Sequence, residues 1–309
     1  GLGTMMPSAI SQILEQIANA IVSVWAAYVL YNYGTKVGAV LGNAENYAAA
    51  YGAAGGTLGT GTGAVVGLLF AAFVLLAYLS VFKRQMKRER RAKVDSYSYI
   101  FKILFITIIP VLMSTTIYNC NAILDQAIFK NIANLQGYSA NDISEWNGIY
   151  TGKYKTLINV PISIASALAA SSVPALTAAY TNGKKEAVRS QINTAIRFIM
   201  VVAFPCAVGM GVLASPILQL LFRDSSELAA SMLQLGAVSI VFFSLSTLSN
   251  GLLQGINRMR EPVKNALIAL VLHIGLLVVL MYAFQLNIYA VVYANAFFGL
   301  LLCLSGDRL

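Results

Sequence analysis

The chain has 309 residues, of which 58% are hydrophobic and only 11% are charged, and its mean hydropathy is +0.71. A soluble domain carries about 25% charged residues, so this composition excludes a soluble globular protein and predicts an all-helical integral membrane protein. The formal net charge of +9 is concentrated in one loop, so we expect no nucleic-acid partner.

The first predicted membrane helix, at about 7–31, carries a polar stripe. Its members recur at steps of three and four and therefore share one helix face: Ser8, Gln12, Glu15, Asn19 and Ser23. A polar face on a lipid-length helix is unfavourable unless it faces a protein interior or a water-filled cavity. The stripe, together with Gln16, predicts a substrate pathway. We expect Glu15 to be functional, because an acid inside a span usually has a role.

The second predicted helix, at about 53–82, is marked by glycine. Gly55, Gly59, Gly63 and Gly67 follow one another at a spacing of four. Small residues at that spacing allow another helix backbone to approach closely, so we interpret them as a packing face. A glycine-rich phosphate loop would need a preceding strand and a following Lys-Ser/Thr pair, and the sequence offers neither.

A strongly basic linker follows at 83–97. Its segment from Lys83 to Lys93 holds seven cations and one anion. If this linker is cytoplasmic, alternation of the spans places 16 Lys and Arg inside and five outside, as the positive-inside rule requires. We interpret the linker as a topology determinant that contacts anionic membrane lipids.

Six further spans complete the expected set of eight, at about 98–128, 150–180, 189–221, 228–256, 262–284 and 287–305. Two of them carry polar residues spaced along one side. The first contributes Ser114, Tyr118, Asn121 and Asp125, and the second contributes Lys153, Asn159, Ser163 and Ser166. These residues are candidates to line a cavity. For the Ser and Asn positions, hydrogen bonding between helices is an equal alternative, and Lys153 could instead be a solvated residue at the outer mouth.

The residues best suited to metal or redox chemistry are isolated. Cys120, Cys206 and Cys303 stand singly in apolar segments, so we interpret them as small buried hydrophobes. The one histidine, His273, lies mid-helix in an aliphatic run, where packing or hydrogen bonding is expected rather than catalysis. We predict no metal site, no cofactor and no catalytic residue.

A weak internal repeat links the two ends of the chain. The segment 255–267 resembles 1–13 with one residue inserted before the proline that opens each helix. A six-helix repeat would make 98–305 one complete lobe, and 1–82 the last two helices of another lobe whose first four helices are missing. Two repeats around a cavity are a common transporter plan.

Several motifs resemble one transporter family. They are the opening Met5–Gln16, the glycine helix, Ile149–Lys153 followed by Pro161 and Val173–Leu176, and Leu253–Arg258. Together they resemble bacterial polysaccharide biosynthesis proteins of the multidrug/oligosaccharidyl-lipid/polysaccharide (MOP) exporter superfamily, in the branch of stage V sporulation protein B and lipid II flippase-like proteins. That family has 12 or 14 helices in two six-helix lobes, so this chain would run from the fifth helix to the twelfth. The ending 304–309 departs from the family pattern and suggests a truncated reading frame.

The resemblance implies a flippase of the bacterial cytoplasmic membrane that moves an undecaprenyl-pyrophosphate-linked sugar by alternating access. The polar residues named above would line its cavity. Lys153, at a position where relatives often carry a basic residue, would pair with pyrophosphate.

Two other functions are open at this stage. A cation-coupled multidrug antiporter of the same superfamily would use an acid such as Glu15 for coupling to H+ or Na+. A membrane enzyme of polysaccharide assembly would need paired carboxylates or a metal-binding cluster beside the membrane. The twelve Asp and Glu of the chain show no such pairing, so we expect a transporter rather than an enzyme.

Overall fold

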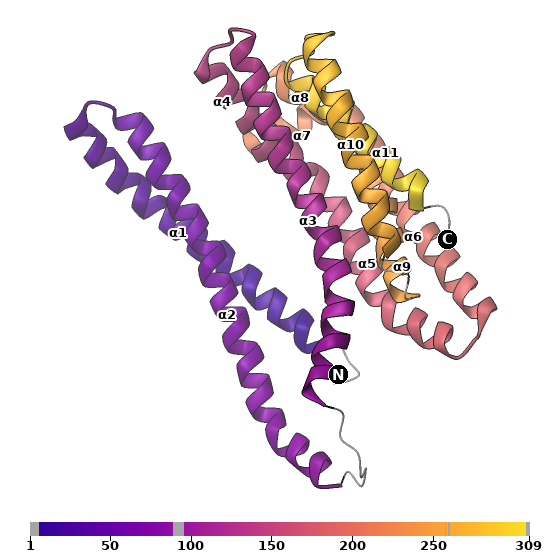
Figure 1. The fold of residues 1–309 in the computed structure, drawn as a ribbon. Coiled ribbons are helices and arrows are strands. Elements are labelled where there is room, and N and C mark those ends of the chain that lie inside the picture. Colours follow the sequence, from indigo (N-terminus) through magenta and orange to yellow (C-terminus); the bar gives the residue numbers. More distant parts are fainter. Residues whose placement is uncertain (1–5, 89–95, 257, 259, 307–309) are drawn as a thin grey trace. The chain divides into compact units, whose positions relative to one another are not determined.

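The computed structural model describes residues 6–88, 96–256, 258 and 260–306, and it is helical throughout these ranges apart from short turns. The side chains at positions 85, 88, 107, 110, 111, 114, 115 and 118 are not described. The chain forms two compact units, Gly1–Val94 and Asp95–Leu309, which are considered separately (Figure 1).

The first unit is a helical hairpin of α1 (Met6–Leu41) and α2 (Ala44–Arg88). The turn between them contains Gly42 at a φ of 83°, a conformation that favours glycine. Both helices extend beyond the predicted spans at 7–31 and 53–82, so most of the segment between those spans is helical. The reason is close packing, because a Cβ at Gly34 would meet the Tyr47 carbonyl oxygen at 2.5 Å.

The glycine face of α2 lies against α1. Its four members, Gly55, Gly59, Gly63 and Gly67, are all buried. A methyl group at Gly59 would overlap Ser23 Oγ, and one at Gly63 would lie 2.7 Å from the Glu15 carbonyl oxygen. The close approach allows the Ser23 hydroxyl to donate a hydrogen bond to the Gly56 carbonyl at 2.9 Å. Glycine at these positions therefore sets the distance between the helices.

The second unit contains the remaining elements in an all-helical bundle. They are α3 (Tyr97–Leu135), α4 (Ala140–Ile149), the π-helical turn η1 (Tyr150–Tyr154), α5 (Lys155–Thr181), α6 (Lys185–Val212), α7 (Ala214–Phe222), α8 (Glu227–Gly236), α9 (Ser239–Gly255), α10 (Arg260–Tyr282) and α11 (Ile288–Gly306). Helix α9 packs against α5, α6 and α11, and α10 packs against α3 and α11. This arrangement brings α3, η1, α10 and α11 around one interior region.

Three predicted spans differ from the structure. The span at 189–221 breaks at Leu213 between α6 and α7, because Pro216 lacks an N–H and its ring opposes the carbonyl four residues earlier. The span at 228–256 is bent by 46° between α8 and α9. The span at 150–180 starts earlier, because α4, η1 and α5 form one continuous stretch over Ala140–Thr181.

Membrane spans account for most of the described chain. Among the described residues, six helices are long and apolar enough to cross a membrane, and the bent α8–α9 pair can provide a seventh. The predicted span at 98–128 lies on α3, which includes positions whose side chains are not described. Residues 89–95 of the basic linker, and parts of both repeat copies (1–5, 257 and 259), lie outside the described residues.

Candidate functional site

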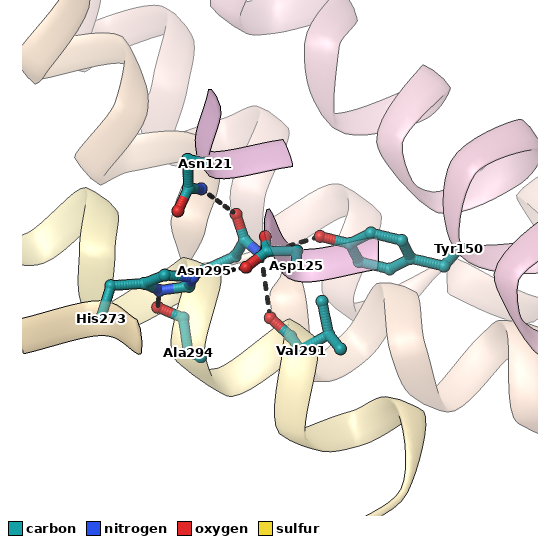
Figure 2. A network of polar contacts seen from close by, with 7 residues as sticks. All are labelled: Asn121, Asp125, Tyr150, His273, Val291, Ala294 and Asn295. Atoms are coloured by element: carbon teal, nitrogen blue, oxygen red, sulfur yellow. Dashed lines mark hydrogen bonds and ion pairs between the residues drawn. The ribbon is translucent and has the colours of Figure 1, made fainter. Parts of the chain in front are cut away.

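A buried acid–histidine pair lies at the centre of the second unit. Asp125 on α3 is 1% exposed and His273 on α10 is 0% exposed. The His273 Nε2 atom lies 2.6 Å from Asp125 Oδ1, and His273 Nδ1 lies 2.8 Å from the Ala294 carbonyl oxygen on α11. The pair therefore joins three helices through polar contacts in an apolar interior (Figure 2).

Asn295 on α11 connects this pair to the rest of the site. Its side-chain amide donates to Asp125 Oδ2 at 2.7 Å and to the Tyr150 hydroxyl at 2.9 Å. On the other side, Asn121 of α3 approaches Asn295 Oδ1 at 3.5 Å, and no hydrogen-bond partner for Asn121 Oδ1 is found among the described residues. We call Asn121, Asp125, Tyr150, His273 and Asn295 the polar network.

A cavity of about 260 Å³ adjoins the polar network. Its wall includes three network members (Asn121, Tyr150 and Asn295) together with Lys155, Asn159 and Phe298. The ammonium of Lys155 lies 5.1 Å from the centroid of the Tyr150 ring, a distance at which a cation is attracted to an aromatic face. The cavity thus offers one cation and several amide and hydroxyl groups to a ligand.

The π-helical turn positions the aromatic wall. Tyr150 and Tyr154, at its two ends, stack with ring centroids 5.3 Å apart. The space for Tyr154 comes from Gly236 on α8, where a methyl group would overlap the tyrosine ring. Single π turns within α-helices often occur at functional sites, and this one lies immediately before Lys155.

Lys153 lies elsewhere. Its ammonium forms an ion pair with Asp224 at 2.5 Å, and Asp224 also accepts a hydrogen bond from the Ser226 backbone N–H at 2.9 Å. The hydrogen bond from Lys153, followed by that from Ser226, lowers the pKa of Asp224 below its ordinary value. Lys153 is therefore a partly exposed cation that is paired with Asp224.

Some of the other predicted site residues of the second unit lie at the polar network or the cavity, and others do not. Asn121 and Asp125 belong to the polar network, and Asn159 lines the cavity. Ser163 and Ser166 are exposed and donate to carbonyls of their own helix, at Val160 and Ile162. The side chains of Ser114 and Tyr118 lie outside the described residues.

In the first unit, the predicted stripe splits between two environments. Gln12 and Gln16 are exposed, along an open groove on α1. Glu15 and Asn19 are partly buried, and both lie beside the position that a methyl group would take at Gly63. Asn19 Oδ1 also lies 2.9 Å from Ser23 Oγ. This half of the stripe is part of the packing between α1 and α2.

Sequence reasoning missed four members of the site. Tyr150, Lys155 and Asn295 were not selected, and His273 was expected to pack or hydrogen-bond without an assigned partner. A signal was present for Asn295, an amide in the apolar run Val291–Phe298, because a buried amide requires hydrogen-bond partners. The pairing across α3, α10 and α11 joins residues 148 and 170 positions apart, a separation that local patterns cannot reveal.

The family match and the curated relatives of this chain point to the same family. The lipid II flippase MurJ family matches residues 4–305. The lipid II flippase MurJ of Bacillus subtilis (strain 168) is 25% identical over 289 residues, which cover 88% of this chain and 48% of that protein. The probable lipid II flippase MurJ of Bdellovibrio bacteriovorus is 28% identical over 160 residues, or 50% of this chain and 30% of the relative.

Solved structures agree on the fold. A crystal structure of MATE in the bent conformation superposes with a TM-score of 0.68 at 15% identity, covering 98% of this chain and 60% of that one. A crystal structure of MATE in the straight conformation superposes with a TM-score of 0.62 at 13% identity, covering 96% of this chain and 76% of that one. The chain thus has a MATE-like transporter fold and spans about half the length of the curated relatives. On this evidence, the chain is a multi-pass membrane protein that belongs to the lipid II flippase MurJ family.

Proposed function

We propose that the full-length protein flips an undecaprenyl-pyrophosphate-linked cell-wall precursor across the bacterial cytoplasmic membrane. The observation that carries this proposal is the family match over residues 4–305. Such a substrate has a charged, polar headgroup that hydrocarbon excludes, and a tail that can stay in lipid. The protein must therefore supply a polar path for the headgroup alone, which alternating access between two lobes provides.

The proposed lobes follow the two units of the structure. Residues 98–305 form the complete C-terminal lobe, 1–82 are the last two helices of the N-terminal lobe, and 83–97 form the cytoplasmic linker between them. The separate packing of Gly1–Val94 and Asp95–Leu309 supports this division. The bonds of Asp125, His273 and Asn295 across α3, α10 and α11 would help the C-terminal lobe to move as a rigid body.

Within each unit, polar residues are candidates for contact with the headgroup. Gln12 and Gln16 would line the path on α1, and Glu15 and Asn19 would reach it with the part of each side chain that the packing against α2 leaves exposed. In the second unit, Asn121 and Asn159 would line it beside Lys155, whose ammonium suits a pyrophosphate. Lys153 would bind a headgroup only by exchanging its partner Asp224 for phosphate. The remaining candidates, Ser114, Tyr118, Ser163 and Ser166, would contribute hydroxyl groups.

Two further partners belong to this proposal. Anionic lipids would bind the linker at Lys83–Lys93 through its excess positive charge. A coupling cation, H+ or Na+, would act at Glu15, the one acid between Met6 and Leu41. Both would bias the conformational cycle without contacting the sugar.

The proposal is tested by headgroup binding to the full-length protein in nanodiscs. Undecaprenyl-pyrophosphate-linked sugar should bind more tightly than undecaprenol carrying the same sugar without phosphate. Lys155→Met should reduce that preference by about tenfold, the loss expected from one charge-assisted contact. Lys264→Met, at an exposed cation on α10, is the control and should leave the preference unchanged. Equal binding of both lipids by the wild type would contradict the proposed substrate.

A further inference from the structure

A second cavity of the second unit, of about 530 Å³, lies at the turn between α5 and α6. Its wall is completed by the N-terminal part of α6, by Ser249 of α9 and by Gly306 at the end of α11. These two residues are in close contact, because a methyl group at Gly306 would lie 3.1 Å from the Ser249 Cβ. The described walls of this cavity and of the cavity beside Lys155 have no residue in common, so the two cavities are separate.

The rim of this second cavity is basic. Lys184, Lys185 and Arg189 line it, and all three are exposed. The described wall contains no Asp or Glu, and no ion pair of these three cations is found among the described residues. Glu186, the acid in the first turn of α6, is not part of the wall. The rim therefore presents three positive charges to whatever enters the cavity.

The place of two of these cations favours an anionic ligand. Lys184 is the N-cap of α6 and Lys185 is its first residue. The start of a helix carries a partial positive charge, so cations are unfavourable there and anions are favourable. Helix α6 also has no side-chain cap at this end, which leaves backbone N–H groups that can donate to an anion. A phosphate at the rim would offset the charge of the lysines and of the helix terminus together.

The floor of the cavity is apolar. Val188, Ile192 and Ile196 follow one another at steps of four on α6 and therefore share one face. They line the cavity and are partly buried against the core between α5, α6 and α9. The exposed Tyr180 adjoins them, and tyrosine is enriched where a membrane meets water. A soluble anion would use only the basic rim, whereas a lipid would use both the rim and the apolar floor.

We propose that this cavity binds the phosphate headgroup of an anionic phospholipid, with an acyl chain along Val188, Ile192 and Ile196. The topology expected from the charge distribution places the α5–α6 turn on the cytoplasmic side. The cytoplasmic leaflet carries anionic lipids, and basic pockets between membrane helices on this side bind their headgroups. Arg189 can donate two parallel hydrogen bonds to a phosphate.

This lipid site is independent of the proposed transport function. None of the residues proposed to contact the transported headgroup lines the cavity. The site also differs from the proposed attraction of lipids to the linker at Lys83–Lys93, because it combines charge with an enclosed apolar surface. A lipid held there would join the α5–α6 turn to α9 and α11 at the membrane surface.

Photo-crosslinking of the full-length protein in nanodiscs tests the site. The probe is phosphatidylglycerol with a diazirine in its acyl chain, and the reference is phosphatidylcholine with the same chain and no net charge. Crosslinks are mapped by mass spectrometry to the segment 180–196. Phosphatidylglycerol should label this segment at least about tenfold more than phosphatidylcholine, because each Lys or Arg near an anionic lipid contributes about a fivefold preference.

A triple variant of the rim tests the role of its charge. Lys184→Gln, Lys185→Gln and Arg189→Gln together remove the three cations and leave the apolar floor in place. Labelling of 180–196 by phosphatidylglycerol should then fall to the level of phosphatidylcholine. Labelling that keeps the wild-type preference would show that these cations do not bind the headgroup and would overturn the proposal.

A matched triple variant controls for the general attraction of lipids to a basic surface. Arg258→Gln, Arg260→Gln and Lys264→Gln remove the same charge at exposed positions outside the cavity wall, on the same expected side of the membrane. This variant should keep the wild-type labelling of 180–196. An equal loss in both triple variants would mean that surface charge alone attracts the lipid, which contradicts a site in the cavity.

The wild type alone can overturn the proposal, even if the rim variant fails to fold. Equal labelling of 180–196 by the two probes is the behaviour of ordinary boundary lipid, and the absence of labelling by either would show that lipid does not enter the cavity. Millimolar inorganic phosphate or glycerol 3-phosphate should not displace the probe, since neither contacts the apolar floor. Displacement by either would assign the rim to a soluble anion and contradict the lipid site.

Discussion

In the second unit, buried polar side chains form hydrogen bonds with partners on other helices. Asp125, His273 and Asn295 lie on three different elements, yet their contacts with one another range from 2.6 to 2.7 Å. An unpaired buried polar group costs about 1–3 kcal/mol, so each of these residues depends on the others. Their identities are therefore constrained together.

The Lys153–Asp224 pair gives a prediction for pH. Because Lys153 lowers the pKa of Asp224, the pair should stabilise the fold fully above the unfolded-state pKa of about 3.9. That contribution should disappear as the pH falls through the lower folded-state pKa. At neutral pH, Asp224→Asn should lose about 1 kcal/mol or less, as for other accessible ion pairs.

Thermal unfolding in detergent between pH 2 and pH 7 checks this prediction. The difference between wild type and Asp224→Asn should be largest at neutral pH and should vanish in acid. Glu227→Gln, three residues away at the start of α8, serves as the matched control. A difference that grows as the pH falls would contradict the sign of the assigned pKa shift.

Among the elements, the α1–α2 hairpin is specified by the spacing of its glycines. Gly55, Gly59 and Gly63 leave room only for the backbone and small side chains of α1. This face could be predicted from the sequence because a four-residue spacing of small residues has one simple physical reading. Helix ends were harder to predict, since Gly34 and Gly38 extend the pairing into a segment without a clear hydrophobic pattern.

Substitution within this face should separate the helices. Gly59→Leu should destabilise the hairpin by about 1–3 kcal/mol or more, because the added side chain overlaps Ser23 and must push the backbones apart. Gly61→Leu is the matched control, since no described atom of a neighbouring helix lies within 4 Å of its Cβ position. Gly59→Leu should unfold at a lower temperature and be cleaved faster by protease than Gly61→Leu. Equal stability of the two variants would contradict the packing role of Gly59.

For the whole molecule, composition and resemblance led to the membrane class, the transporter fold and the family, and the comparisons support all three. The site was only partly predictable. Polar periodicity selected Asn121 and Asp125 but also selected Ser163 and Ser166, which bond to their own helix. Periodicity reports which residues share a face, whereas the polar network depends on which helices meet, and long-range packing decides that.

The most direct test of the central claim is flipping by the full-length protein in reconstituted vesicles. A fluorescent undecaprenyl-pyrophosphate-linked sugar on the inner leaflet should become accessible to an external quencher. Glu15→Gln keeps the shape of the side chain but removes its charge. If the acid couples or gates the cycle, this variant should fold normally and flip the lipid-linked sugar at least tenfold more slowly. Flipping of the lipid-linked sugar without uptake of cationic drugs is the predicted result. Drug transport driven by a cation gradient, without lipid flipping, would contradict the account.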